Sequence, residues 1–474
     1  MLSFHPVVSI LQKLTRKEFP SQPLSPQWLM ALGFLLAILI GTLLLTLPAA
    51  NTSGRGLGPV AAFFTATSAT CVTGLSVLDI GTDLTLFGQL VVLTLIQLGG
   101  LGITSFGTFL LVLVGRRLSV QNEFVLMDAY GVGKVTGIRS LLFWTVGFTV
   151  IFEGIGTFIL WSRYMMPHPG MTPLPNTWTA LYYAAFHAIS AFCNAGFSLH
   201  SNSMIPFQND FVFTGAIEIL IFFGGIGFLV TYNLVTIKFW RRNLMTRGRI
   251  SLHSKIALFT SMVLILIGTG LFLQQEWSNT LGHLPLASKI SCALFQSISP
   301  RTAGFNIVPT DQIKEISRLT TGILMMIGGC PGSAAGGVKA TTVAVLIMTI
   351  IAMCKGRRET VIWSRTIPNT VVRESIIIFL LALSLIVVAY GLLLWTEFPQ
   401  KADDASKLLF ETISGVATTG LSINHTPSLS TAGRMIIIVC MFVGRLGPLA
   451  IALMIGNRDE GQRIRYPVEE IVVG

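Results

Sequence analysis

The sequence predicts an all-α polytopic membrane protein in which four fused repeats surround a central pore. Of its 474 residues, 52% are hydrophobic and only 11% are charged. This composition leaves too little polar surface for a soluble globule of that size. A short glycine-centred loop also returns four times, at intervals of about 110 to 120 residues, which is the spacing of an internally repeated membrane protein.

The expected helices follow from the lengths of the apolar runs. An α-helix rises 1.5 Å per residue, so about 20 residues cross a hydrocarbon core of roughly 30 Å. Shorter runs of about 12 to 17 residues reach only part-way, and we expect these half-length pore helices at 59–71, 177–193, 286–299 and 402–417. Eight runs of full length begin near Trp28, Leu86, Leu141, Phe211, Ile256, Thr320, Ser375 and Arg434.

Each repeat is therefore expected to contain a span, a pore helix, a loop and a second span. The first apolar run follows a basic segment but is too long for the apolar region of a signal peptide, so we expect it to be retained as a span. The expected organisation is an N-terminal segment at 1–27, four repeats at 28–115, 141–240, 256–355 and 375–456, and a C-terminal tail at 457–474.

The loops after the pore helices carry the functional prediction. Non-helical backbone at membrane depth is tolerated only where it is buried in protein or lines a water-filled cavity. Glycine allows the positive φ that turns successive carbonyls inward, and rings of carbonyls can replace the hydration shell of an ion. The expected ion-binding residues of this selectivity filter are all uncharged: Val72, Thr73, Gly74, Asn194, Ala195, Gly196, Thr302, Ala303, Gly304, Thr418, Thr419 and Gly420.

A second glycine-rich mark follows each loop after about 24 to 28 residues. At Gly99 and Gly224 the simpler interpretation is close packing of helices, because small residues let membrane helices approach. The third mark, within residues 328–339, contains too many helix breakers for an ordinary helix. We therefore expect only the third repeat to break its second span, with a flexible internal loop at that place.

Charges set the expected orientation. Lys and Arg gather in the segments between repeats and near both termini, whereas the opposite side has few of them. By the positive-inside rule both termini are cytoplasmic and the glycine loops enter from outside. The formal net charge of +11 thus reflects membrane topology and indicates no nucleic-acid partner. The six cysteines show no paired or metal-ligand spacing, which predicts unpaired thiols.

Several charged residues in apolar surroundings have more than one interpretation. Arg445 is either part of a gate near the pore or the partner of a buried acid. Lys339 is either a gate residue or a lysine whose stem reaches to the cytoplasmic surface. Three glutamates also lie in apolar surroundings: Glu153, Glu218 and Glu411. They either relay ions or protons, or they cap broken backbone or pair with a basic residue. Asp79 and Asp83 either concentrate cations outside or lie in a solvated loop.

The four loops, the stretch from Thr67 to Leu75, the stretch from Arg301 to Asn306 and the segment 328–339 resemble the Trk/Ktr/HKT superfamily of cation transporters. Within it the chain is most similar to the membrane subunit of bacterial Ktr-type potassium uptake systems. The resemblance covers nearly the whole chain. It implies a channel-like potassium uptake protein of the plasma membrane that binds potassium at the filter residues and has no covalently bound cofactor. Sodium is a further ion, and whether it drives or only activates the transport is left open.

The resemblance also implies partners and a gate. The family forms homodimers with one pore in each subunit, bound to a cytoplasmic ring of nucleotide-binding regulatory subunits. Glycine at all four filter positions favours potassium, because some sodium-favouring relatives carry serine at the first. The residues that match the family's intramembrane gate are Gly328, Gly329, Pro331, Gly332, Ser333, Gly336, Gly337, Lys339 and Arg445.

Two other classes of function were weighed against this one. An alternating-access transporter coupled to sodium or protons also uses broken helices, but it usually places them in paired inverted halves rather than in four same-direction units. A membrane enzyme would need a catalytic set, and His187, His200 and His425 are isolated in the sequence. We therefore expect no enzyme activity.

Overall fold

The computed structural model describes residues 26–102, 105, 138–166, 174, 176–236, 250–397 and 405–455. These residues are mostly helical, and the strands among them are the two of one short hairpin, β1 (Val361–Ile362) and β2 (Arg365–Thr366). The expected N-terminal segment, the C-terminal tail and most of the basic segments after the first and second repeats lie outside the described residues.

The first helix of each repeat is a full-length span. These helices are α2 (Pro26–Leu45), α7 (Ile138–Tyr164), α11 (Leu252–Glu276) and α15 (Asn369–Glu397). In the described part of the chain, these four are the unbroken helices that are long and apolar enough to cross a membrane. Only 22–33% of the apolar stretch of each helix is buried inside the protein. Apolar side chains that face outward along most of a helix are stable only in lipid, so this composition fits an outer ring of spans.

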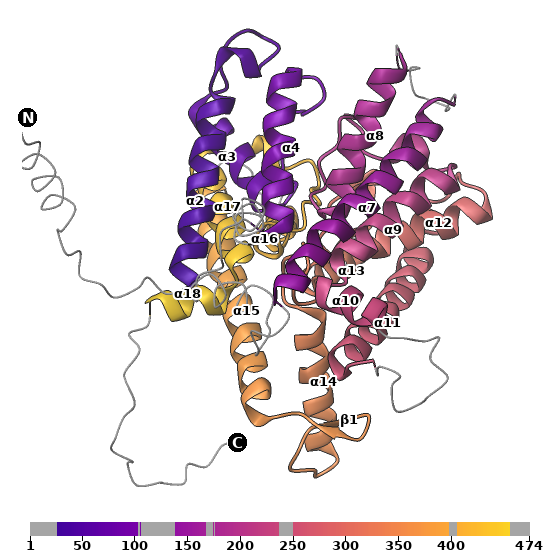
Figure 1. Cartoon of the computed structure of the whole chain (residues 1–474), viewed down its shortest axis with the longest axis vertical. Coiled ribbons are helices and arrows are strands. Elements are labelled where there is room, and N and C mark those ends of the chain that lie inside the picture. Colours follow the sequence, from indigo (N-terminus) through magenta and orange to yellow (C-terminus); the bar gives the residue numbers. More distant parts are fainter. Residues whose placement is uncertain are drawn as a thin grey trace, which may run out of the picture.

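The second helix of each repeat is a half-length pore helix. These helices are α3 (Pro59–Thr70), α8 (Thr177–Phe192), α12 (Leu286–Ile298) and α16 (Ala405–Ala417). Figure 1 draws α3 and α8 in the upper part of the molecule, and this side is called the upper side below. Local sequence explains their starts, since α3 has proline in its first turn and the Asn176 side chain accepts a hydrogen bond from the backbone of Thr179 at 2.8 Å.

The third helix of each repeat is shorter than the sequence predicts. α4 (Leu86–Leu101), α9 (Phe211–Gly225), α13 (Glu315–Met326) and α17 (Thr431–Leu446) have 12 to 16 residues. The prediction that only the third repeat breaks its second span is wrong, because all four helices end at their glycine marks. Three of these ends have a glycine with left-handed φ, at Gly102 (80°), Gly227 (94°) and Gly447 (90°), a conformation that terminates helices.

The chain continues differently after each break. In the second repeat α10 (Phe228–Thr236) leaves α9 at 93°. In the third, residues 327–339 form an irregular segment before α14 (Ala340–Cys354), and in the fourth α18 (Pro448–Ile455) follows Gly447. Single 3-10 turns lie in the upper connections at η1 (Pro48–Ala50), η2 (Ile205–Phe207), η3 (Thr310–Gln312) and η4 (Thr426–Ser428).

Polar contacts tie the upper end of each first helix to the start of the third helix in repeats two to four. Arg163 forms an ion pair with Asp210, the N-cap of α9, at 2.9 Å. Glu276 accepts a hydrogen bond of 2.9 Å from the backbone N–H that precedes α13. Glu397 accepts from the backbone N–H of Ser430, the N-cap of α17, at 3.2 Å. These contacts set the spacing between the outer and inner helices of each repeat.

The hydrophobic core is divided among the contacts between neighbouring repeats. One cluster joins the second and third repeats, another the first and second, and a smaller one the third and fourth. A further cluster contains Phe64 of α3 and Ile437 of α17 and so joins the first repeat to the last. Figure 1 shows the indigo helices of the first repeat beside yellow α17, so the four repeats close into a ring.

Candidate functional site

The four glycine loops share one backbone conformation. The residue two positions before each glycine has a left-handed φ, with values of 56° at Val72, 58° at Asn194, 73° at Thr302 and 49° at Thr418. The glycines follow with 95° at Gly74, 70° at Gly196, 80° at Gly304 and 89° at Gly420. A positive φ is unfavourable for β-branched residues, and Val72, Thr302 and Thr418 are β-branched. Surrounding contacts must therefore hold the loops in this shape.

The loops meet one another in cyclic order. A Cβ atom built on each glycine would overlap the carbonyl oxygen just before the glycine of the next loop, so only glycine allows this approach. The pairs are Gly74 with Ala195, Gly196 with Ala303, Gly304 with Thr419, and Gly420 with Thr73. The last pair returns to the first repeat, and the four loops form a closed ring, called the loop ring below.

A buried serine near the end of each pore helix supports the loop ring. Ser68 accepts a hydrogen bond from the backbone N–H of Gly74 at 3.1 Å, and Ser414 accepts from that of Gly420 at 3.0 Å. In the other two loops the hydroxyl donates to the carbonyl just after the glycine, from Ser190 at 2.8 Å and from Ser299 at 2.6 Å. Sequence reasoning missed these residues, although a serine five or six positions before each glycine was a visible signal.

Several hydroxyl groups of the loop ring have no hydrogen-bond partner within the described residues. They are fully buried and belong to Thr73, Thr302, Thr418 and Thr419. Buried polar groups are normally paired, so the unpaired hydroxyls of these four threonines are unusual and can serve as ligands. The twelve filter residues carry no charged side chain, and Arg301, which precedes Thr302 in the third loop, donates to the Ser261 hydroxyl of α11 at 2.9 Å. The ring therefore offers uncharged oxygen atoms, from carbonyls and hydroxyls, to a species that passes through it.

The second glycine marks pack against the ends of the pore helices. A Cβ on Gly99 would overlap the carbonyl oxygen of Thr70, and one on Gly224 would overlap that of Phe192. Close helix packing, the interpretation favoured for the first two repeats, is therefore present at these glycines. In the fourth repeat Gly444 lies in the same way against Val416. The glycine marks both end the third helices and let those helices approach the loop ring.

Segment 327–339 lies on the lower side of the loop ring. A Cβ on Gly336 would overlap the side chain of Thr418, so the segment touches the fourth loop directly. Backbone hydrogen bonds join it to the bend between α9 and α10, from Cys330 N to Gly225 O at 2.9 Å and from Phe228 N to Gly332 O at 2.8 Å. The segment thus spans the space between the second and fourth repeats.

Two basic side chains bind carbonyls of this segment, Arg445 from α17 and Lys339 from the end of the segment itself. Arg445 donates to the carbonyl oxygens of Ala334 in the segment and Gly99 in the first repeat. The structure shows these two carbonyls as its partners and no acid among the described residues, which disfavours the role of partner to a buried acid. Lys339 donates to the carbonyl oxygen of Ala335 at 2.7 Å. Both side chains line a cavity of about 320 Å³ on the lower side, between α2, the segment and the start of α18.

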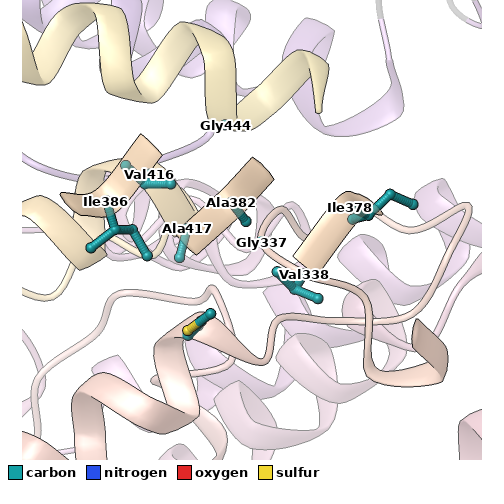
Figure 2. A pocket seen from close by; sticks show the side chains of 9 residues that line it. Gly337, Val338, Ile378, Ala382, Ile386, Val416, Ala417 and Gly444 are labelled. Atoms are coloured by element: carbon teal, nitrogen blue, oxygen red, sulfur yellow. The ribbon is translucent and has the colours of Figure 1, made fainter. Parts of the chain in front are cut away.

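A smaller, mainly apolar cavity lies beside the same segment. Figure 2 shows Val338 and Gly337 of the segment facing Ala382 and Ile386 of α15, with Ala417 between them. Its volume is about 20 Å³, close to the space of a single water molecule. The segment therefore borders this small cavity on the side of α15, whereas backbone hydrogen bonds join it to the second repeat.

The buried acids differ in their surroundings. Glu411 accepts hydrogen bonds from the chain that leaves the fourth loop. Glu153 accepts from Gln97 at 3.3 Å and from the thiol of Cys193 at 3.8 Å. One carboxylate oxygen of Glu218 is buried without a hydrogen-bond partner among the described residues. Asp79 stays local and accepts from the backbone of Gly81 at 2.8 Å, as expected for a loop residue.

The cysteines and potential metal ligands add no second centre in the described ranges. All six cysteines are free, as the sequence predicts, and Cys354 is exposed whereas the other five are buried. No group of three or more His, Cys, Asp or Glu side chains that could hold a metal ion occurs among the residues searched. Among the described residues, the loop ring is thus the site whose geometry all four repeats share.

A helical membrane protein that closes four re-entrant loops with uncharged filter residues into one ring has the architecture of an ion-transport protein. The sequence model of the TrkH family, described as cation transport protein, matches residues 31–460. Since the match covers most of the chain, this protein belongs to the TrkH family of cation transport proteins.

Individual relatives agree with this assignment. The chain is 36% identical over 455 residues to Ktr system potassium uptake protein B of Bacillus subtilis (strain 168), covering 95% of this chain and 97% of that protein. It is 38% identical over 445 residues to the protein of the same name from Vibrio alginolyticus, covering 94% of each. It is 34% identical over 473 residues to the potassium/sodium uptake protein NtpJ of Enterococcus hirae, covering 98% of this chain and 100% of that one.

The fold also agrees with a crystal structure. The potassium transporter TrkH from Vibrio parahaemolyticus superposes with a TM-score of 0.69 over 95% of this chain and 89% of that chain. The sequence identity is 18%, so this likeness concerns the fold. It confirms the expected class of four fused repeats with spans and pore helices.

Proposed function

We propose that this chain takes up potassium across the plasma membrane by conducting it through the loop ring. One observation carries the proposal: four loops with uncharged filter residues meet in cyclic order, each with a glycine against the carbonyl of the next loop. Rings of carbonyls can replace the hydration shell of an ion without trapping it. The relatives named above as potassium uptake proteins B support potassium as the ion.

The proposed ligands are carbonyl and hydroxyl oxygens of the filter residues predicted from the sequence. The C-terminal ends of the pore helices add a smaller effect. Each end carries about −0.5 charge, and at roughly 8 Å with an effective dielectric near 20 it stabilises a monovalent cation by about 1 kcal/mol. The idealised cost of dehydrating a small ion is on the order of 20 kcal/mol. The helix ends therefore favour cations, while the oxygen ligands perform most of the dehydration.

Selectivity for potassium is proposed to depend on glycine at all four loops. Any side chain there would displace the carbonyl of the neighbouring loop and change the size of the ring. Potassium uptake is further proposed to depend on sodium. The name of the Enterococcus hirae relative, potassium/sodium uptake protein, supports a part for sodium.

The proposed gate is segment 327–339 together with Lys339 and Arg445. The segment touches Thr418 from the lower side, and the two basic side chains hold its carbonyls. A cation that leaves the ring downward meets this segment and two positive charges before it reaches the cavity of about 320 Å³. Movement of the segment would open the path.

The same proposal places the protein in an assembly. The upper side, where the pore helices begin, faces outward, and both termini are cytoplasmic. The chain acts as a homodimer with a pore in each subunit, bound on its cytoplasmic side to a ring of nucleotide-binding regulatory subunits. Two relatives are named as parts of a Ktr system, which supports the presence of a further component.

Growth and uptake in cells that lack potassium uptake systems test this function. Wild type is compared with Gly74→Ser and Gly304→Ser, whose new side chains would meet Ala195 and Thr419. The control is Gly54→Ser, because Gly54 also has a positive φ of 68° but has nothing within 4 Å of its built Cβ. We expect about a tenfold loss of potassium over sodium preference in the ring variants, equal to about 1.4 kcal/mol. An unchanged preference in both would overturn the filter assignment.

A further inference from the structure

One position in each pore helix carries a buried polar residue in every repeat. It lies three residues before the supporting serine, and its residues are Thr65, His187, Gln296 and Glu411. Their side chains are at most 1% exposed. Four polar residues at one repeated place in the apolar interior are unexpected, because buried polar groups are unfavourable unless they are paired.

In the fourth repeat Glu411 holds the chain that leaves the loop ring. Its carboxylate accepts from the Ser422 hydroxyl at 2.6 Å and from the Ile423 backbone N–H at 3.0 Å. The second carboxylate oxygen accepts from the Thr426 hydroxyl at 2.5 Å. These donors lie two to six residues after Gly420. The glycine is thus fastened on both sides, by Ser414 before it and by Glu411 after it.

In the second repeat His187 makes the corresponding contact with different chemistry. Its Nε2 atom accepts from the backbone N–H of Leu199 at 3.3 Å and lies 3.0 Å from the Ser198 hydroxyl. Its Nδ1 atom lies 2.8 Å from the carbonyl oxygen of Tyr183. A backbone N–H only donates and a carbonyl only accepts, so these partners define a neutral imidazole with its proton on Nδ1.

The first and third repeats keep a polar residue at this position but leave it without a partner. The hydroxyl of Thr65 and both side-chain polar atoms of Gln296 are buried with no hydrogen bond among the described residues. The loops follow one another around the ring in chain order. The repeats in which this pore-helix residue itself binds the outgoing chain, the second and the fourth, therefore lie opposite each other across the ring.

We propose that His187 and Glu411 are positioning residues that set ion preference by fixing the second and fourth loops from behind. The inference rests on the proposed function of the loop ring. A carbonyl ring distinguishes ions by its size and by the strength of its ligands, so a loop free to shift would lose discrimination. Fastening the chain before and after the glycine keeps each carbonyl in place. Neither side chain needs to touch the ion.

A second buried acid with similar hydrogen bonds, Glu397, serves as the control that distinguishes positioning of the loop from stabilisation of the fold. Glu397 is also buried, at 6% exposure, and also accepts from a serine hydroxyl and a backbone N–H, both of Ser430. Its contacts lie on the upper side between α15 and α17, away from the loop ring. Loss of Glu397 should weaken the fold without changing the ring.

The test compares full-length wild type with Glu411→Ala, Glu411→Gln and Glu397→Ala. Uptake of potassium and of sodium is measured separately in cells that lack potassium uptake systems. The midpoint temperature of thermal unfolding is measured for each purified protein. We expect Glu411→Ala to lose about tenfold in potassium over sodium preference, since bonds to a charged acceptor are removed. Glu411→Gln should retain most of it, because the amide oxygen can still accept from Ile423. Glu397→Ala should lower the midpoint and leave the preference unchanged.

A second pair tests the other residue and protects against a variant that fails to fold. His187→Phe removes the acceptor, whereas His187→Gln places an amide oxygen near the position of Nε2. The expected result is loss in the first and rescue in the second. Unchanged preference in folded Glu411→Ala and His187→Phe would overturn the inference, as would an equal shift in Glu397→Ala. If Gly304→Ser also keeps its potassium over sodium preference, the proposed filter is wrong. If Gly304→Ser loses the preference while folded Glu411→Ala and His187→Phe keep it, the filter stands and only the positioning role of His187 and Glu411 is wrong.

Discussion

Arg445 of the last repeat donates a hydrogen bond to the backbone carbonyl of Gly99 in the first repeat, although 346 positions separate them in the chain. The same guanidinium binds Ala334 in segment 327–339. A planar guanidinium with several donors can hold two carbonyls at once, which a lysine ammonium does less well. One side chain thus joins the first, third and fourth repeats on the lower side of the loop ring.

Removing this side chain should raise flux and leave ion preference unchanged. In Arg445→Ala the segment loses a bond to a charged donor, and the path below the ring loses a positive charge. We expect uptake to rise about tenfold, because such bonds contribute on the order of 1.5 to 3 kcal/mol. Initial rates of potassium uptake, normalised to the amount of protein, measure the effect.

The control for this variant is Arg434→Ala on the same helix. Arg434 also donates to a carbonyl, that of Pro427 at 2.9 Å, but does so on the upper side. It should leave the rate within about twofold of wild type, because its contact lies away from segment 327–339 and from the path below the ring. A changed ion preference with an unchanged rate in Arg445→Ala would remove the gate assignment.

Shortening segment 327–339 should have the same kind of effect. Deletion of residues 333–336 removes the carbonyls held by Arg445 and Lys339 and the contact with Thr418. We expect faster uptake at unaltered potassium over sodium preference, because the loop ring itself is unchanged. Ala334→Gly is the control, since it keeps the carbonyl that Arg445 binds. Slower uptake with the deletion would show that the segment supports the path rather than obstructs it.

Loss of Glu276 should destabilise the third repeat. Its carboxylate accepts from the backbone N–H of Lys314 at 2.9 Å and from the Ser317 hydroxyl at 2.5 Å, so Glu276→Ala leaves buried donors unpaired. We expect a loss of about 1.5 to 3 kcal/mol in unfolding free energy. Thermal unfolding of the purified protein in detergent measures it, with the exposed Glu374→Ala as control. Equal midpoints for the two variants would contradict this account.

Cys354 provides a test of orientation. It is the exposed member of the six cysteines and lies at the end of α14, on the lower side. A maleimide that cannot cross membranes should label it in inverted vesicles and not in intact cells, because the lower side is proposed to be cytoplasmic. Cys354→Ser should abolish the labelling, since the other five thiols are buried. Labelling in intact cells would reverse the proposed orientation.

The pore helices were predictable because their signals are local. The runs expected at 59–71, 177–193 and 286–299 each end one residue beyond the observed helix, and the run at 402–417 ends at the observed Ala417. Each run is apolar and leads into a glycine that a left-handed turn requires. The third helices were not predicted correctly. A continuous apolar run is compatible with an unbroken span, and where it breaks depends on contacts with the loop ring.

Composition, run lengths and the fourfold return of the glycine loop were sufficient to establish a membrane protein of four repeats, because each of these is written in consecutive residues. The placement of Glu411, His187 and Arg445 was not. Each of them binds backbone groups, and a backbone N–H or carbonyl has no signature in the sequence. Such partners become visible only when folding brings distant segments together, as it brings Gly99 to Arg445. Sequence therefore specified the parts of the ring, whereas packing between repeats specified how the ring is held.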